Sequence, residues 1–176
     1  YTLTSDAIHP KQITKPSQYR FADFSIDHNC NRVICVAEYH FSEQGESEPT
    51  NKLVSVDLKT GTITDLFNGD DFYANPRLSP DGKHLAWISW NHPNMPWDNT
   101  QLWLAKLDNA GQITFAEHMT GISESSVIQP EWSPNGQLYY VCDQNGWWNL
   151  YRLDMKRREL SSEPIVSMFA EFGQPQ

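Results

Sequence analysis

A short turn followed by an apolar run recurs at a fixed distance along this chain, and that repeat limits the fold more than any other feature. Residues 79–90 read SPDGKHLAWISW, residues 133–143 read SPNGQLYYVCD, and residues 25–38, SIDHNCNRVICVAE, are a looser copy. The serines that open these copies are 54 residues apart in both steps. Proline presets the φ angle of such a turn, and glycine accepts a positive φ. A fixed period of this size indicates a repeat architecture.

Each repeat contains four strand-like segments separated by short polar stretches. The expected strands are 19–24, 32–39, 52–58 and 62–67, then 72–78, 85–90, 101–107 and 113–118, then 127–132, 138–142, 149–153 and a weaker 160–167. No segment has helical periodicity over ten residues. Four antiparallel strands in a repeat of about 40–50 residues are typical of a β-propeller blade. A β-sandwich is the structural alternative, but it would not explain the period.

Both ends of the chain match interior parts of a repeat. The pair Ile13-Thr14 recurs at 63–64 and 113–114, and Gln174-Pro175 corresponds to 75–76 and 129–130. We therefore predict an all-β protein, a β-propeller segment of three four-stranded antiparallel blades with partial blades at both ends. The expected boundaries are 1–18 for the outer strands of a preceding blade, 19–69, 70–120 and 121–169 for three blades, and 170–176 for the start of a following one. This pattern predicts a longer parent chain.

The composition excludes several classes of function. A net charge of −9 argues against a nucleic acid or an anionic membrane surface as the main partner. No run is long enough to span a membrane. The three cysteines lack metal-ligand spacing, and the chain has no HExxH string, P-loop or dinucleotide fingerprint, so we expect no metal and no cofactor. Cys35 and Cys142 lie in apolar runs as core residues, which suits a reducing compartment and predicts a cytoplasmic location.

No catalytic residue is expected in this segment. A nucleophile elbow needs the string GxSxG on a strand-to-helix turn. The nearest match is Gly121-Ile-Ser-Glu-Ser, which ends in Ser125 instead of glycine and falls in a predicted loop. We interpret it as a coincidence.

The richest candidate for ligand binding is the loop at residues 91–98, NHPNMPWD. In a four-stranded meander this loop lies at the same end as the connection to the next blade. His92 begins the loop, and two prolines stiffen it, which lowers the entropic cost of presenting Trp97 and Asp98 to a ligand. A carboxylate beside an indole suits an ammonium group such as a peptide N-terminus. The alternative is that Trp97 packs over the blade edge and Asp98 makes a turn.

Three further residues are weaker candidates for the same surface. Trp147 and Trp148 follow a turn signal, and because they alternate along a strand, one is expected in the core and the other at the channel or the loop end. Glu171, with Asp70 and Asp71, lies in a connection between blades, where acids could attract a cationic peptide end or a cation. Solvated turns explain these acids equally well. Arg77, on a first strand, is expected to pair with neighbouring acids such as Asp23.

Several strings identify a resemblance. Residues 19–24 (YRFADF), 90–103 (WNHPNMPWDNTQLW) and 146–152 (GWWNLYR), with the SPDG turns, resemble the TolB-like and WD-repeat-like propellers of prolyl oligopeptidase family serine peptidases, in the acylaminoacyl-peptidase/dipeptidyl-peptidase branch. The resemblance implies a C-terminal α/β-hydrolase domain that carries the catalytic Ser, Asp and His. It also implies that the propeller gates that site and contributes to peptide binding.

The leading hypothesis is therefore a non-catalytic propeller segment of a serine peptidase. Its expected partners are a peptide substrate and the hydrolase domain of the same chain, with self-association through open sheet edges. One alternative is a TolB-like protein-interaction platform. Another is a carbohydrate-binding propeller, because aromatic faces with nearby carboxylates also suit sugars.

Overall fold

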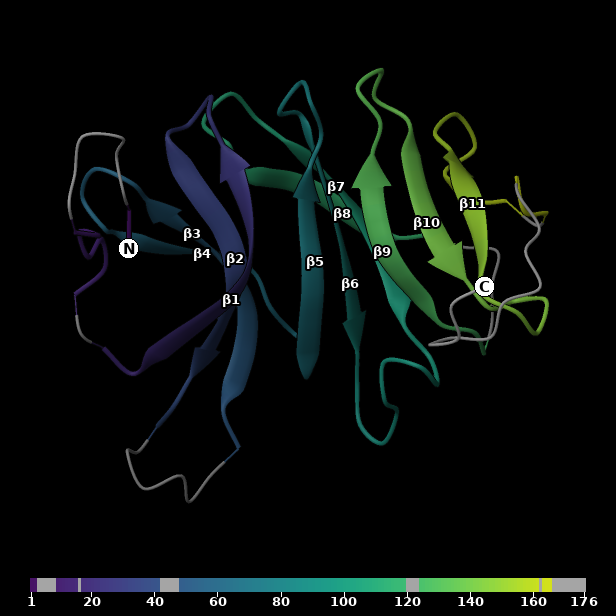
Figure 1. The fold of residues 1–176 in the computed structure, drawn as a ribbon, viewed down its shortest axis with the longest axis horizontal. Helices are drawn as coiled ribbons and strands as arrows, with labels where there is room; N and C mark the ends of the chain where they lie inside the picture. The colour runs from purple at the N-terminus through teal and green to yellow at the C-terminus, as the bar shows by residue number, and fades with distance from the viewer. Residues whose placement is uncertain (3–8, 16, 42–47, 120–123, 162, 166–176) are drawn as a thin grey trace.

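The computed structural model describes residues 1–2, 9–15, 17–41, 48–119, 124–161 and 163–165. These residues form three four-stranded antiparallel sheets, each with its strands in chain order (Figure 1). The first sheet contains β1 (Tyr19–Asp27), β2 (Arg32–Tyr39), β3 (Thr50–Asp57) and β4 (Ile63–Phe67). The second contains β5 (Phe72–Leu78), β6 (His84–Trp90), β7 (Gln101–Leu107) and β8 (Ile113–His118). The third contains β9 (Val127–Trp132), β10 (Leu138–Cys142), β11 (Asn149–Asp154) and the short β12 (Glu159–Leu160).

The prediction of an all-β protein built from propeller-like blades is confirmed. The sheets stand side by side with the second in the middle, and the innermost strands β1, β5 and β9 are neighbours (Figure 1). Within the described ranges, no helix is long and apolar enough to cross a membrane. Residues 170–176, expected to open a further blade, lie outside the described residues.

The core lies between the sheets, so the apolar runs found in the sequence are buried on both faces. Five consecutive residues of β6 are buried, because its two faces pack against the first and third sheets. Trp87 is fully buried between the first two sheets. Its ring centroid lies 4.8 Å from that of Phe67 and 5.8 Å from that of Trp103, with the two indoles parallel within 2°. Cys35 and Cys142 are buried and free of disulfides, as expected of core residues.

The turns at the opposite end from the 91–98 loop show that one part of the repeat alignment, that of the opening serines, needs correction. Ser79 accepts the His84 amide N–H through its Oγ (2.9 Å), and Ser133 does the same for Gln137 (3.0 Å). In the first sheet, Asp27 stands at the position of the turn serine. Asp27 lies opposite Arg32 in the β1–β2 pairing, just as Ser79 lies opposite His84 in the second sheet. Aligning Ser25 with the other two serines is therefore wrong, and the first interval of the repeat is 52 residues, the distance from 27 to 79.

Each innermost strand contains a bulge at an equivalent position. Asp23, Asn75 and Gln129 have φ angles of 54°, 52° and 51°, a left-handed conformation that asparagine and aspartate tolerate better than most residues. The Asp23 carboxylate accepts the Asn75 amide N–H and so ties two sheets together. Arg77 extends this link, since its Nη1 donates to Asp23 (3.1 Å) and its Nε donates to Glu131 (2.7 Å). The predicted pairing of Arg77 with acids is confirmed.

Candidate functional site

The long loops and the connections between sheets lie at one end of the molecule, at the lower edge of Figure 1. We call this end the loop face and define it by residues 40–41, 48–49, 68–71, 91–100, 124–126, 143–148, 161 and 163–165. Hydrogen bonds join its parts: Asp71 N donates to Asn91 Oδ1 (2.7 Å), and Asn91 Nδ2 donates to Asp70 Oδ1 (2.9 Å). The expectation that the 91–98 loop lies beside the connections is confirmed.

The loop from 91 to 100 is held at both ends by neighbouring segments. At its start, His92 N donates to Asp71 Oδ2 (2.9 Å). At its end, the Thr100 hydroxyl oxygen donates to the Val127 carbonyl and accepts the Val127 amide, both at 2.6 Å. The Ser126 hydroxyl also donates to the Pro96 carbonyl. These bonds, together with the two prolines, fix the loop before any ligand arrives, which lowers the entropic cost of binding.

The two central candidates of this loop have different roles in the structure. The Asp98 carboxylate accepts the Met95 amide N–H (2.8 Å), and the Asp98 amide donates to the Met95 carbonyl (2.9 Å), so Asp98 holds the turn. The Trp97 side chain is 58% exposed and Met95 is 46% exposed. The structure therefore gives Asp98 the turn-forming role considered as the alternative, while Trp97 remains open to a ligand.

His92 lies at the junction of the first two sheets. Its Nε2 is 2.8 Å from Glu48 Oε1, and its ring centroid is 4.9 Å from that of Phe72. Phe72 stacks on Trp90 at 5.3 Å. The result is an aromatic group next to an exposed histidine–carboxylate contact, on the same face as Trp97.

The β10–β11 loop adds two aromatic residues to the loop face. Trp147 is 45% exposed, whereas Trp148 is partly buried. The buried Asn149 orders this loop by donating to Asn145 Oδ1 (3.1 Å) and to the Trp147 carbonyl (3.2 Å). The last candidate, Glu171, lies outside the described residues.

Polar residues that the sequence did not point to form the floor beside Asp70. Asn51 Nδ2 donates to the Asp71 carbonyl, and the Asp70 amide donates to the Tyr73 hydroxyl oxygen, both at 2.7 Å. Burial raises the pKa of Tyr73 to about 12, with the Asp70 and Asp71 charges acting in the same direction, so the phenol stays protonated. Among the described residues, Asn51 Oδ1 and Asp70 Oδ2 are buried and have no hydrogen-bond partner. No local sequence signal shows that a strand residue such as Asn51 bonds to the connection that carries Asp71.

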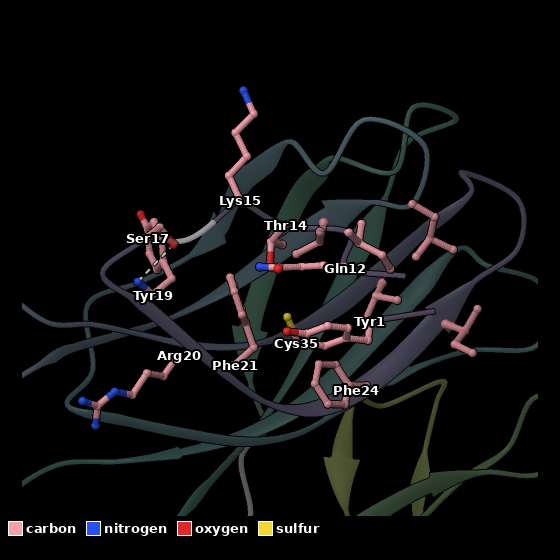
Figure 2. Close-up of a pocket in the computed structure, with 15 residues that line it drawn as sticks. Tyr1, Gln12, Thr14, Lys15, Ser17, Tyr19, Arg20, Phe21, Phe24 and Cys35 are labelled. Carbon is pink, nitrogen blue, oxygen red and sulfur yellow. Dashed lines mark hydrogen bonds between the residues drawn. The ribbon is translucent and has the colours of Figure 1, made fainter. Parts of the chain in front are cut away.

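A hollow lies on the face of the first sheet that points away from the second and third sheets. It has a volume of about 590 Å³, and Figure 2 shows Tyr1, Phe21 and Phe24 around Cys35, with Lys15 pointing outward. Burial raises the pKa of the Cys35 thiol to about 12, so it is not a nucleophile. The described residues that line the hollow are mostly apolar or aromatic. In the part of the chain that the structure describes, no three His, Cys, Asp or Glu side chains could jointly hold a metal ion.

Comparisons with known proteins agree with this architecture. No family model matches the chain. A structure of a puromycin hydrolase S511A mutant superposes with a TM-score of 0.78 and 32% identity, over 87% of this chain and 25% of that protein. A puromycin-hydrolyzing peptidase from Mycobacterium tuberculosis gives a TM-score of 0.79 and 30% identity, over 90% and 26%. Dipeptidyl-peptidase 5 of Porphyromonas gingivalis is 29% identical over 99 residues, which are 56% of this chain and 14% of the relative.

The chain resembles the propeller domain of prolyl oligopeptidase family peptidases. It spans about a quarter of the length of the solved puromycin hydrolases. Acylaminoacyl peptidase from Pyrococcus horikoshii (TM-score 0.54) and TolB from Acinetobacter baumannii (TM-score 0.61), each 18% identical, share the fold alone. The resemblance inferred from the sequence is confirmed.

Proposed function

We propose that this segment is a non-catalytic propeller part of a serine peptidase, which gates access to a C-terminal hydrolase domain and forms part of its peptide-binding wall. The observation that carries the proposal is the 91–100 loop, which neighbouring segments hold at both ends and which leaves Trp97 exposed. Exposed tryptophans on rigid segments are frequent hot spots of binding. The identity of 30–32% with puromycin hydrolases supports the peptidase over the alternatives.

The alternatives predicted from the sequence have less support. A TolB-like interaction platform rests on 18% identity, which carries only the fold. A carbohydrate-binding propeller would use the same exposed indoles, but the Asp98 carboxylate is already engaged by the Met95 amide. The catalytic Ser, Asp and His would come from the proposed hydrolase domain. The blade boundaries 19–69, 70–120 and 121–169 and a cytoplasmic location remain part of this proposal.

Replacing Trp97 by alanine in the full-length protein is expected to raise KM for peptides about five- to thirtyfold with little change in kcat. The indole would contact the substrate away from the reacting bond, so its loss weakens substrate and transition-state binding alike. Steady-state kinetics on a series of peptides of different length measures this.

The matched control is Phe115→Ala, which removes an exposed aromatic ring from β8. Unchanged KM in the Trp97 variant, or an equal rise in both variants, contradicts the proposed binding role. Gating and binding are separated by measuring two reactions of the same variant, peptide hydrolysis and labelling by a covalent serine probe. Unequal slowing of the two reactions would distinguish gating from binding.

We also propose that the segment, when produced alone, associates through its first sheet. Phe24 and Ile26 are 61% and 56% exposed on the face that carries the hollow of Figure 2. Exposed apolar surface next to an open sheet is a common cause of association. Replacing both residues by lysine is expected to convert a concentration-dependent oligomer into a monomer, measured by light scattering after gel filtration. A monomeric native segment at about 100 μM contradicts the proposal.

A further inference from the structure

Negative charge is concentrated at one end of the molecule. The loop face carries no lysine or arginine among its described residues, but it carries seven acids: Glu48, Asp70, Asp71, Asp98, Glu124, Asp143 and Glu163. The short turns at the opposite end, counted with the residues that flank them (27–32, 57–63, 79–84, 108–113, 133–138 and 154–159), carry six bases and six acids. The bases are Arg32, Lys59, Lys83, Lys156, Arg157 and Arg158, and the acids are Asp27, Asp57, Asp81, Asp108, Asp154 and Glu159. The overall negative charge is therefore concentrated where the candidate binding residues lie.

Within the described residues, none of these seven acids pairs with a lysine or an arginine. Glu48 Oε1 lies 2.8 Å from His92 Nε2. Asp71, Asp98 and Asp143 accept hydrogen bonds from neutral backbone amides, which leave their negative charge in place. Two exposed bases border this end of the first sheet: Lys15, in the segment that leads into β1, and Arg20, the second residue of β1. A surface with one sign of charge attracts ligands of the opposite sign and raises their association rate.

Among the described residues, two buried oxygens beside the connection that carries Asp70 and Asp71 have no hydrogen-bond donor. Asn51 is 8% exposed, and its side chain reaches the connection that carries Asp70 and Asp71, because its Nδ2 donates to the Asp71 carbonyl. That carbonyl can only accept, which fixes Nδ2 on its side and leaves Oδ1 as the atom without a partner. Asp70 Oδ2 is unpartnered as well. Both atoms are acceptors, and a buried acceptor without a donor is unfavourable.

We infer that the loop face selects peptides that carry positive charge, a conclusion that rests on the proposed function and names its substrate class. The acids supply attraction to ammonium and guanidinium groups, and the exposed Trp97 and Trp147 indoles supply cation–π and apolar contacts. The buried, unpartnered oxygens of Asn51 and Asp70 add negative partial charge beneath this surface without contacting the ligand. Peptides that carry glutamate or aspartate meet repulsion on the same surface.

The test compares two fluorescently labelled decapeptides that differ in three positions, lysine in one and glutamate in the other. Their affinities for the full-length protein are measured by anisotropy after treatment with a fluorophosphonate, which prevents cleavage by a serine peptidase. At low salt the lysine peptide is expected to bind at least tenfold more tightly, and this ratio is expected to shrink at about 0.5 M salt because of screening. Equal affinities, or tighter binding of the glutamate peptide, overturn the inference.

A pair of charge reversals locates the effect. Glu124→Lys changes an exposed acid of the loop face, and Glu159→Lys changes an exposed acid at the opposite end. The first is expected to weaken binding of the lysine peptide about three- to tenfold, and the second to leave it within about twofold. Equal effects of both variants overturn the inference. The proposed function fails separately, through absence of binding to either peptide or absence of fluorophosphonate labelling.

Discussion

Replacing Trp87 by alanine is expected to lower the free energy of unfolding by about 3–5 kcal/mol. The side chain is fully buried between the first two sheets, where it packs against Phe67 and Trp103. Its removal would leave a large cavity that these rings cannot fill from their present positions. Urea denaturation followed by circular dichroism measures the change as a fall in the midpoint at constant slope.

Two other substitutions make this prediction specific. Trp97→Ala removes an indole that is 58% exposed and is expected to change stability by less than about 0.5 kcal/mol. Trp87→Phe is expected to cost less than the alanine variant, because it keeps most of the apolar volume and the indole N–H of Trp87 has no hydrogen-bond partner in the described structure. Similar losses at Trp87 and Trp97 would show that the two sheets do not depend on this cluster.

Arg32→Met is expected to cost about 3–5 kcal/mol near neutral pH, because it leaves a buried carboxylate without its cation. The Arg32 Nε donates to Asp27 Oδ2 (2.8 Å), and both side chains are almost fully buried. Arg32 Nη2 also donates to the Gly111 carbonyl (2.6 Å) and so ties the first sheet to the β7–β8 turn. A Cβ at position 111 would lie 2.3 Å from this nitrogen, which explains the glycine.

The pH dependence of this loss gives an independent check. Burial by itself raises the pKa of Asp27, but the hydrogen bonds from Arg32 and the Cys30 amide and the Arg32 charge outweigh it, so the pKa lies below its usual value of 3.8. The ionised Asp27 therefore stabilises the fold at pH values above its usual pKa of 3.8. This stabilisation is lost as the pH falls through the lower pKa that Asp27 has in the folded state. Without Arg32, burial dominates and Asp27 takes up a proton at higher pH.

The difference in unfolding free energy between native protein and Arg32→Met is therefore expected to be smaller at pH 3 than at pH 7. The double variant Asp27→Asn/Arg32→Met is the matched control, since asparagine keeps an acceptor for the Asn29 and Cys30 amides without a charge. It is expected to recover part of the stability at pH 7. A loss that is equal at both pH values, with no recovery in the double variant, would contradict a role for the Asp27 charge.

The strands could be predicted from the sequence because their signals are local. Apolar runs after SPDG-type turns place β6 and β10 within a residue of their observed bounds. The alignment of Ser25 failed because Asp27 stands at the position of the turn serine and holds its turn through other amides, those of Asn29 and Cys30. The anchors of the 91–100 loop were also missed, since Thr100 and Ser126 contact partners that are distant in the sequence. The sequence left two interpretations of Trp97 open, and its 58% exposure leaves a ligand-binding role as a proposal.

The order of the sheets has a consequence for how stability is shared. In the described structure, every substantial contact between sheets involves β5, β6 or β7, all of which belong to the second sheet. Folding energy in such a row is a sum of terms within each unit and terms between nearest neighbours. A substitution in the second sheet can weaken two interfaces at once, whereas one on an outer sheet weakens one. The second sheet therefore acts as the cooperative link through which the other two sense each other's unfolding.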